Sequence, residues 1–355
     1  MRVVSVVGAR PQFIKAAVVS RAIRSRHEEI LVHTGQHYDD NMSAVFFEQL
    51  RLPSPERHLD VGSGTHGRQT GQMLERLEAV MVETRPDVVL IYGDTNSTLA
   101  GALVAAKLCL PLAHVEAGLR SFDRRMPEEV NRLVADHLSD WLFCPTATAR
   151  RNLEREGIAR GTVVGDVMLD LLLESVERLP PPEAALAALG VEPGGYYLAT
   201  IHRAGNTDDR LRLRGIVEGL GELDRSTILP LHPRTRAALD GFGLLPLRSP
   251  GRVRIVEPLG YLDMLQLERH AAAIVTDSGG VQKEAYFLGV PCVTVRDETE
   301  WVETTEDGWN VLVGADGHEL AAAARRPKPA TPPKPHFGQG DAALRIVRHL
   351  EDGAA

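Results

Sequence analysis

Four carboxylates in one stretch of the chain are placed for acid/base chemistry. Asp94 comes shortly after the apolar run 87–92, and Glu116 directly follows the apolar run 111–115. Glu128 and Glu129 follow a proline at the start of an expected helix. Because the carboxyl ends of parallel strands line the ligand crevice of an open α/β sheet, three carboxylates from these sites should face one cleft. Carboxylates held in this way can remove and return protons.

A purely structural role is the alternative for the two glutamates of the expected helix. Carboxylates in a first helical turn stabilise the helix dipole, and this explains both Glu128 and Glu129 without any catalysis. Further along the helix, apolar residues and one histidine recur at the spacing of a buried helix face. These residues are Val130, Leu133, Val134, His137 and Leu138. We therefore interpret His137 as a core histidine rather than a ligand.

Two turns are suited to holding phosphate groups. The first, GARP at 8–11, joins the largely apolar run 3–7 to a helix that carries Lys15 one turn in. The second, DSGG at 277–280, follows another apolar run and opens a helix. The first turns of helices present free backbone N–H groups to anions, and glycine lets a diphosphate approach closely. Glu284 is then placed to accept hydrogen bonds from ribose. Ordinary strand-to-helix turns with solvated charges are the alternative.

The alternation of strands and helices predicts an α/β protein, and 355 residues favour two domains over one. A proline cluster near 179–182 marks the region where the strand-helix rhythm starts afresh. We predict domains at 1–170 and 171–335, each Rossmann-like, with a C-terminal helix at 336–355 that packs back on the first. Polar clusters again follow the strands of the second half, including His202, His232 and Arg234.

Composition narrows the function further. A net charge of −8 gives no support to binding of nucleic acid or of a membrane surface. The three cysteines, Cys109, Cys144 and Cys292, lie among apolar neighbours and predict buried thiols in a reducing cytoplasm. No metal-binding motif, nicotinamide fingerprint or serine-hydrolase elbow occurs in the sequence. A cytoplasmic enzyme for a small soluble substrate is the class that fits.

Nine short segments occur in the order typical of one enzyme family. They are GARPQFIK, TGQHYD, GDTNSTLAG, HVEAGLRS, PEEVNR, TIHRAGN, LHPRT, TDSGGVQKEA and VRDETEW. With them the sequence resembles the non-hydrolysing UDP-N-acetylglucosamine 2-epimerases. The resemblance implies a GT-B type fold, in which two Rossmann-like domains with parallel sheets face a central cleft that holds UDP. It also implies reversible inversion at C2 to UDP-N-acetylmannosamine, by elimination of UDP to a 2-acetamidoglucal intermediate and re-addition.

The resemblance also assigns roles, position by position. The catalytic residues would be Asp94, Glu116, Glu128 and His202. UDP and the sugar would be bound by Arg10, Lys15, His232, Arg234, Ser278, Gly279, Gly280, Glu284 and Arg296. Gln36 and His37 match a segment that helps to bind a second, activating UDP-sugar in some bacterial members, although Tyr38 here replaces the arginine common at that point. Glu129 keeps only its role as a helix cap.

Other expectations follow from the same resemblance. The enzyme would need no cofactor or metal, act in the cytoplasm as a homodimer, bind neither nucleic acid nor membrane, and supply cell-surface polysaccharide biosynthesis. Two segments, TEWVE and IHRAGN, depart from the more frequent TERPE and SHRREN. The substrate could therefore instead be a related UDP-2,3-diacetamido-uronic acid. The sequence also leaves open a hydrolysing epimerase that releases N-acetylmannosamine and UDP, a glycosyltransferase, and a protein that only binds a UDP-sugar.

Overall fold

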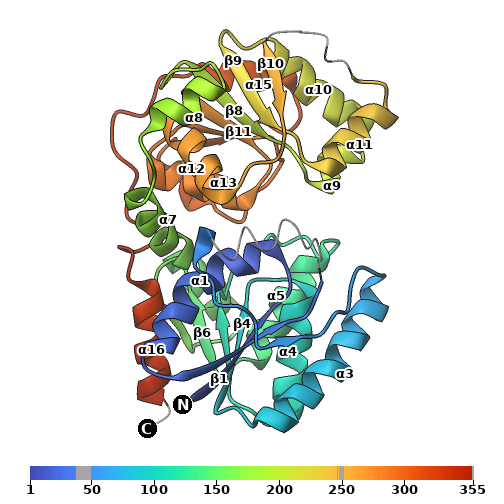
Figure 1. The fold of residues 1–355 in the computed structure, drawn as a ribbon, viewed down its shortest axis with the longest axis vertical. Coiled ribbons are helices and arrows are strands. Elements are labelled where there is room, and N and C mark those ends of the chain that lie inside the picture. The colour runs from blue at the N-terminus through green and yellow to red at the C-terminus, as the bar shows by residue number, and fades with distance from the viewer. Residues whose placement is uncertain (37–48, 246, 248–251, 354–355) are drawn as a thin grey trace. The chain divides into compact units, whose positions relative to one another are not determined.

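A computed structural model describes residues 1–36, 49–245, 247 and 252–353 of the chain. These residues form two compact units, each built around its own parallel sheet (Figure 1). The first unit comprises Met1–Glu174 and Pro335–Ala355, and the second comprises Ser175–Lys334. The predicted fold class, two α/β domains with parallel sheets, is confirmed.

The first unit contains a seven-stranded parallel sheet in the order β3-β2-β1-β4-β5-β6-β7. Its strands are β1 (Arg2–Val7), β2 (Glu28–His33), β3 (Arg57–His58), β4 (Val88–Tyr92), β5 (Leu112–Val115), β6 (Trp141–Cys144) and β7 (Gly161–Val163). Its helices are α1 (Arg10–Arg24), α3 (His66–Thr84), α4 (Asn96–Lys107), α5 (Pro127–Leu138), α6 (Ala147–Arg155), α7 (Val167–Glu177) and α16 (Ala342–Gly353), with α7 crossing the unit boundary.

The central strands of this sheet are apolar on both faces because helices cover both. Every residue of β4 and β5 is buried, as parallel sheets with two covered faces require. Helices α3, α4 and α5 pack against one another on one side of the sheet, and α1 and α16 lie together on the other (Figure 1). The core beneath α3 and α4 joins their apolar faces to strands β1 and β4.

The second unit contains a six-stranded parallel sheet in the order β10-β9-β8-β11-β12-β13. Its strands are β8 (Tyr196–Thr200), β9 (Ser226–Pro230), β10 (Val253–Val256), β11 (Ala273–Thr276), β12 (Cys292–Thr294) and β13 (Asn310–Leu312). Its helices are α8 (Pro182–Ala188), α9 (Ala204–Thr207), α10 (Arg210–Gly221), α11 (Pro233–Gly241), α12 (Tyr261–His270), α13 (Gly279–Leu288), α14 (Glu303–Glu306) and α15 (Gly317–Ala324). Helices α10 and α15 share one core cluster, and α8, α12 and α13 share another.

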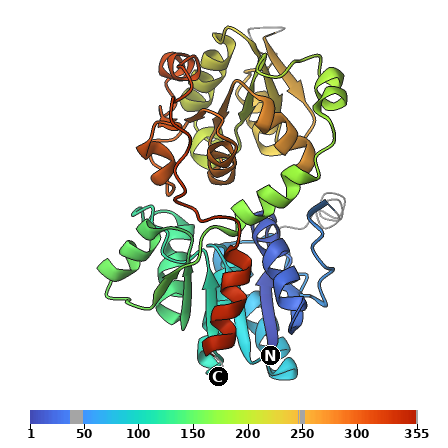
Figure 2. The ribbon, with the colours of Figure 1, turned by 90° about the vertical axis from the view of Figure 1, so that its left-hand side faces the viewer.

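The C-terminal helix α16 belongs to the first unit. It lies beside α1, where Figure 2 shows the last helix next to the first. Its buried face is apolar, with Ile346, Val347 and Leu350 inside. At its N-terminal end Asp170 of α7 accepts a hydrogen bond from the backbone N–H of Ala343 at 2.8 Å. Packing and capping together hold the chain's last helix on the first unit.

Helix α5 departs from the prediction. Its buried residues are Glu129, Asn131, Arg132, Ala135 and Asp136, whereas Val130 is 44% exposed and His137 is exposed. The interpretation of His137 as a core histidine is therefore wrong. The helix packs over polar loops at the carboxyl ends of β4 and β5, whose buried backbone and charged groups need polar partners.

One cysteine prediction is also wrong. Cys144 and Cys292 are buried thiols, but Cys109 is exposed in the turn that follows α4. Its φ of 54° places it in the left-handed region, because the chain reverses there to enter β5. Apolar neighbours in sequence therefore did not imply burial at this turn. Among the described residues, no helix has both the length and the apolar character needed to cross a membrane.

Candidate functional site

The order of the strands in the first sheet creates a crevice at one position on its carboxyl edge. Strands β1 and β4 are neighbours, and the connections from them lead to opposite faces of the sheet. In open α/β sheets ligands bind at such a switch point. The loop after β1 carries Arg10, and the loop after β4 carries Asp94. The strand order thus brings the first phosphate-type turn and the first predicted acid/base residue to the same edge.

Lys15 and Glu116 form a buried ion pair at this edge. The Lys15 ammonium donates a hydrogen bond to Glu116 Oε1, and both residues are more than 90% buried. Gly93 lies against them, because a Cβ at Gly93 would be 2.9 Å from Lys15 Nζ and 3.6 Å from Glu116 Oε1. Glu116 has a φ of 72°, a conformation that residues other than glycine seldom adopt. The fold therefore holds this carboxylate in a fixed place, beside a lysine and next to the Asp94 loop.

Asp94 is held by the first turns of α5. Arg132 donates to Asp94 Oδ2 from Nη2 at 2.6 Å and from Nε at 3.1 Å. The side chain of Asn131 also donates to the backbone oxygen of Asp94 at 2.9 Å. The Asp94 side chain keeps a quarter of its surface exposed. Arg132 thus fixes the carboxylate of Asp94 and Asn131 fixes its backbone, while the side chain stays accessible.

Glu129 lies in the first turn of α5, where the sequence places it, but its hydrogen bonds go to the preceding loop rather than to the N–H groups of its own helix. Its carboxylate accepts hydrogen bonds from the backbone N–H groups of Ser121 and Phe122, at 2.9 and 3.1 Å. It also pairs with Arg132 at 2.9 Å. The reason is that α5 turns this face toward the preceding loop, where backbone donors are buried. Glu129 thereby braces the same arginine that holds Asp94.

The remaining predicted residues of the first unit are distributed differently. Arg10 is exposed at the start of α1, and Glu128 is exposed in the first turn of α5. Gln36 is buried, and its side-chain oxygen accepts from the backbone N–H of Ser97 at 3.1 Å and from its hydroxyl at 2.8 Å. Gln36 therefore ties the loop after β2 to the first turn of α4. His37 lies outside the described residues.

A second switch point lies between β8 and β11 in the other sheet. The loop after β8 carries His202, and the loop after β11 carries the DSGG turn. Asp277 joins the two, because its fully buried carboxylate accepts from the backbone N–H groups of His202 and Arg203 at 3.0 Å. Asn206 donates to the same carboxylate at 3.1 Å. Asp277 is thus the clamp that sets the backbone around His202.

The DSGG turn opens α13 with a built cap. Ser278 is the N-cap residue and its hydroxyl accepts from the backbone N–H of Val281 at 3.4 Å. Gly279 and Gly280 are partly exposed, so their backbone N–H groups are accessible at the positive end of the helix. The helix ends at Gly289 with a φ of 62°, as its sequence predicts.

Glu284, one turn into α13, is buried next to α12. Burial raises the pKa of Glu268 of α12 well above its usual value, and the neighbouring charge of Glu284 raises it further. Burial followed by the same Glu284 charge also raises the pKa of Tyr261. The Glu284 carboxylate thus lies close enough to Glu268 and Tyr261 to raise the pKa of both.

The predicted cations of the second unit are each engaged by carboxylates. Arg234 makes a two-pronged contact with Asp208, at 2.8 Å from Nη2 to both oxygens. Arg296 makes the same kind of contact with the buried Glu300, at 2.9 and 3.0 Å. His232 accepts from the backbone N–H of Arg234 at 3.2 Å, and its ring centroid is 5.7 Å from that of His202. These pairs hold the side chains at the carboxyl edge of the sheet.

Several residues with a part in this arrangement were not predicted. Arg132, Asp136, Asp277 and Glu300 all bond to predicted residues or to their loops. Asp277 could have been found, since it directly follows a strand in the DSGG segment. The polar spacing of Glu129, Arg132 and Asp136 was a second signal, because residues three and four apart share a helix face.

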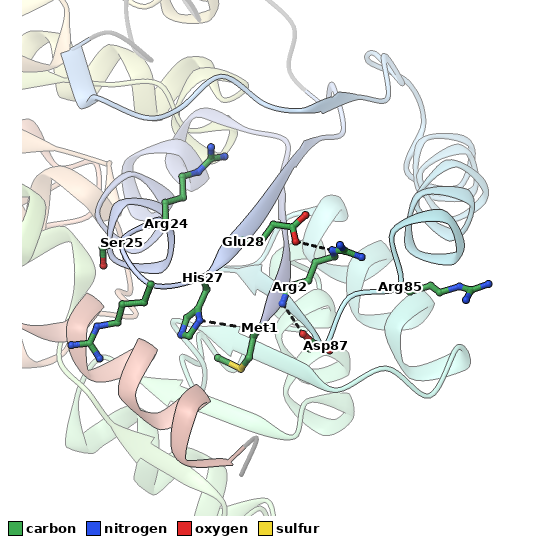
Figure 3. A pocket seen from close by; sticks show the side chains of 9 residues that line it. Met1, Arg2, Arg24, Ser25, His27, Glu28, Arg85 and Asp87 are labelled. Carbon is green, nitrogen blue, oxygen red and sulfur yellow. Dashed lines mark hydrogen bonds and ion pairs between the residues drawn. The ribbon is translucent and has the colours of Figure 1, made fainter.

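One hollow of the first unit lies away from these residues. It has a volume of about 560 Å³ and is lined by residues around the start of β1, the end of α1 and the turn before β4 (Figure 3). These are the amino ends of the strands, whereas Asp94 and Glu116 follow the carboxyl ends of β4 and β5. Within the described ranges, no group of three or more histidine, cysteine or acidic residues could hold a metal ion.

Comparison with known proteins places the chain in one family. The sequence profile of the UDP-N-acetylglucosamine 2-epimerase family matches residues 21–351. A UDP-N-acetylglucosamine 2-epimerase homolog of Methanococcus maripaludis is 49% identical over 99% of this chain and 100% of its own length. A UDP-2,3-diacetamido-2,3-dideoxy-D-glucuronate 2-epimerase of Pseudomonas aeruginosa is 50% identical over 99% of both chains.

A solved structure agrees with the sequence comparisons. The UDP-GlcNAc 2-epimerase of Methanocaldococcus jannaschii, crystallised with UDP-GlcNAc and UDP, is 45% identical. The similarity covers 99% of this chain and 100% of that one, with a TM-score of 0.91. The similarity thus extends over nearly the whole chain in sequence and in fold. This chain belongs to the UDP-N-acetylglucosamine 2-epimerase family.

Proposed function

We propose that the protein interconverts UDP-N-acetylglucosamine and UDP-N-acetylmannosamine by reversible epimerisation at C2. Membership of the family makes this isomerase activity the expected one. The observation that carries the proposal at the level of the site is the carboxyl edge of the first sheet. There, Asp94 is held by Arg132 and Glu116 is held by Lys15, next to a switch point where ligands bind.

The proposed reaction needs a base and an acid at C2. One carboxylate takes the C2 proton, the electrons of the C–H bond form the C1–C2 double bond, and the bond from C1 to the diphosphate oxygen breaks. The products of this step are the 2-acetamidoglucal and UDP. Re-addition reverses each change, with the proton delivered to the other face. Asp94, Glu116 and Glu128 form the proposed acid/base set, and positioned carboxylates suit both proton transfers.

The second unit supplies the proposed binding groups for UDP. The backbone N–H groups of Gly279 and Gly280 begin α13, after the N-cap Ser278, and are suited to the diphosphate. Glu284 is the proposed acceptor for ribose hydroxyls. His202, whose ring is 40% exposed, is proposed to stabilise the charge on departing UDP.

The other predicted residues take supporting roles in this proposal. Arg10 and Lys15 contribute positive charge from the first helix, and His232, Arg234 and Arg296 do so from the loops of the second sheet. Gln36 and His37 remain the proposed activator segment. No cofactor enters the proposed reaction, since proton transfer and elimination need only acid/base groups.

Hydrogen exchange at C2 tests the function directly. Purified protein with UDP-N-acetylglucosamine in deuterated water should place deuterium at C2 of both UDP-sugars and reach an equilibrium mixture. Glu116→Gln should lose nearly all turnover and still bind UDP, because the substitution removes a carboxylate of the first unit and leaves the second unit intact. Absence of C2 exchange by the unmodified protein would rule the function out.

The same assay separates the candidate substrates and reactions. The diacetamido-uronic acid substrate is favoured by one observation, the 50% identity to the Pseudomonas aeruginosa enzyme named for it. Comparing kcat/KM for the two UDP-sugars decides between them. Steady release of free N-acetylmannosamine together with UDP would instead identify a hydrolysing epimerase.

Assembly and cellular role form the last part of the proposal. A homodimer should have twice the 38.8 kDa mass of one chain in light scattering. The exposed apolar residues Val82 of α3 and Val130 of α5 are the first places to look for its interface.

We place the enzyme in the cytoplasm, supplying a sugar for cell-surface polysaccharide, and deletion of its gene should deplete that polysaccharide.

A further inference from the structure

A row of buried charged groups lies behind the proposed acid/base residues. Asp136 of α5 is at its centre, with Oδ1 2.7 Å from His114 Nδ1 and Oδ2 2.7 Å from Arg120 Nη1. Arg120 continues the row to Glu156 at 2.7 Å. His114 and Asp136 are both completely buried. Charges taken out of water at this depth need full compensation from their partners.

This row touches the loops that carry Asp94 and Glu116. His114 Nε2 lies 2.8 Å from the backbone oxygen of Gly93, the residue before Asp94. Asp136 Oδ2 also accepts from the backbone N–H of Gly118, two residues after Glu116, at 3.1 Å. The Asp136 carboxylate therefore bonds directly to the loop after β5. Through the His114 imidazole it is also linked to the loop after β4.

The geometry sets the hydrogen bonds of the pair. A backbone oxygen can only accept, so the Nε2 atom of His114 donates to Gly93. Burial raises the pKa of Asp136, but the hydrogen bond and charge of His114 and the charge of Arg120 outweigh it and lower the pKa overall. His114 thus bridges the Asp136 carboxylate and the Gly93 backbone oxygen.

The loop after β5 needs such support. Glu116 and Gly118 both have left-handed backbone, with φ of 72° and 82°. The backbone N–H groups of Glu116 and Ala117 donate to Phe143 at 3.1 Å each, which holds one side of the turn. Asp136 holds the other side through Gly118. A non-glycine residue stays in this conformation only where its surroundings determine it.

We propose that Asp136 is a positioning residue for epimerisation: through its hydrogen bonds to Gly118 and to His114, it sets the relative placement of the Asp94 and Glu116 carboxylates. This inference rests on the proposed function, because it assumes that those carboxylates transfer protons. Neither Asp136 nor His114 touches substrate, since both are sealed from solvent. Small displacements of reacting groups cost large factors in rate, so the role is a kinetic one.

The test is Asp136→Asn, compared with a matched control. The asparagine side chain has the same shape as aspartate, but one of its oxygens is replaced by an NH₂ group. That NH₂ group would face either the N–H donors of Gly118 and Arg120 or the ring nitrogen of His114. We expect kcat for C2 exchange to fall at least tenfold, while KM and the Kd for UDP stay within about twofold. Exchange of the C2 proton is measured by NMR in deuterated water, and UDP binding by calorimetry.

Glu29→Gln is the control. Glu29 is another buried carboxylate of the first unit, bonded to Ser5 at 2.6 Å and to Arg24 at 2.7 Å. It lies near the amino end of β2, away from the two loops. This variant should lower the Tm as Asp136→Asn does and leave kcat unchanged. The inference would be overturned if Asp136→Asn and Glu29→Gln lowered the Tm equally and both kept an unchanged kcat. It would also be overturned if both variants lost kcat equally.

A second variant covers the case in which Asp136→Asn does not fold. His114→Gln removes the imidazole that links Asp136 to the Gly93 backbone oxygen. Its kcat for C2 exchange should fall at least tenfold while the Kd for UDP stays within about twofold, and an unchanged kcat would overturn the inference. If the unmodified protein itself shows no C2 exchange, the proposed function fails instead, and this inference fails with it.

Discussion

Asp170 should make the docking of the C-terminal helix depend on pH. This carboxylate of α7 is 6% exposed and caps α16 through the backbone N–H of Ala343. Burial raises its pKa to about 6, and the hydrogen bonds from Ala343 and Ala342 offset only part of that effect. The carboxyl group that caps α16 therefore binds its proton more tightly in the folded protein than in the unfolded chain.

The size and sign of the effect follow from this pKa. In the unfolded chain the pKa of an aspartate is about 3.9, so the folded state binds more protons between pH 4 and pH 6. The contribution to stability is complete below pH 4 and is lost as the pH rises through 6. A difference of about 2 pKa units corresponds to about 3 kcal/mol. Asp170→Asn keeps an acceptor for Ala343 and removes the titration.

Hydrogen exchange of the segment 342–353, followed by mass spectrometry, measures the opening of α16 alone. Relative to the unmodified protein, Asp170→Asn should increase the free energy of opening by about 1–3 kcal/mol above pH 7 and by nothing near pH 4. Asp352→Asn is the control, since Asp352 is an exposed carboxylate of the same helix and is not among the charges that shift the pKa of Asp170. An opening free energy in the unmodified protein that does not fall between pH 4 and pH 7 would refute the reasoning, as would equal behaviour of the two variants.

Three further predictions concern the first unit. Arg132→Lys should lower kcat by about tenfold with unchanged binding of UDP. One ammonium group cannot hold both the Asp94 and the Glu129 carboxylates. Steady-state kinetics that match the unmodified enzyme would contradict this. Gly8→Ala should destabilise the unit by about 1–3 kcal/mol in urea unfolding, because its Cβ would overlap the Ser97 hydroxyl; an unchanged midpoint would refute it. Burial lowers the pKa of His33 to about 4, so the unfolded chain takes up a proton first and up to about 3 kcal/mol of stability is lost as the pH falls from 6.5 to 4. His33→Phe should flatten this pH dependence of unfolding.

Much of the molecule was predictable because the determining signals are local. Largely apolar runs at 3–7, 88–92 and 112–115 form strands, since such runs must be buried on both faces. Gly289 ends α13 because glycine adopts left-handed backbone at little cost. The same local patterns placed Asp94, Glu116 and the DSGG turn after strands. The succession of motifs along the chain also indicated the family.

What only the tertiary structure decided was which groups lie next to one another. Sequence order does not state that β1 pairs with β4, or β8 with β11, so it could not locate the switch points. The polar face of α5 was misjudged for the same reason. Helical spacing identifies two faces, but which one is buried depends on the loops that it meets. In those loops Asp94 and His114 need polar partners, and Arg132 and Asp136 of α5 provide them.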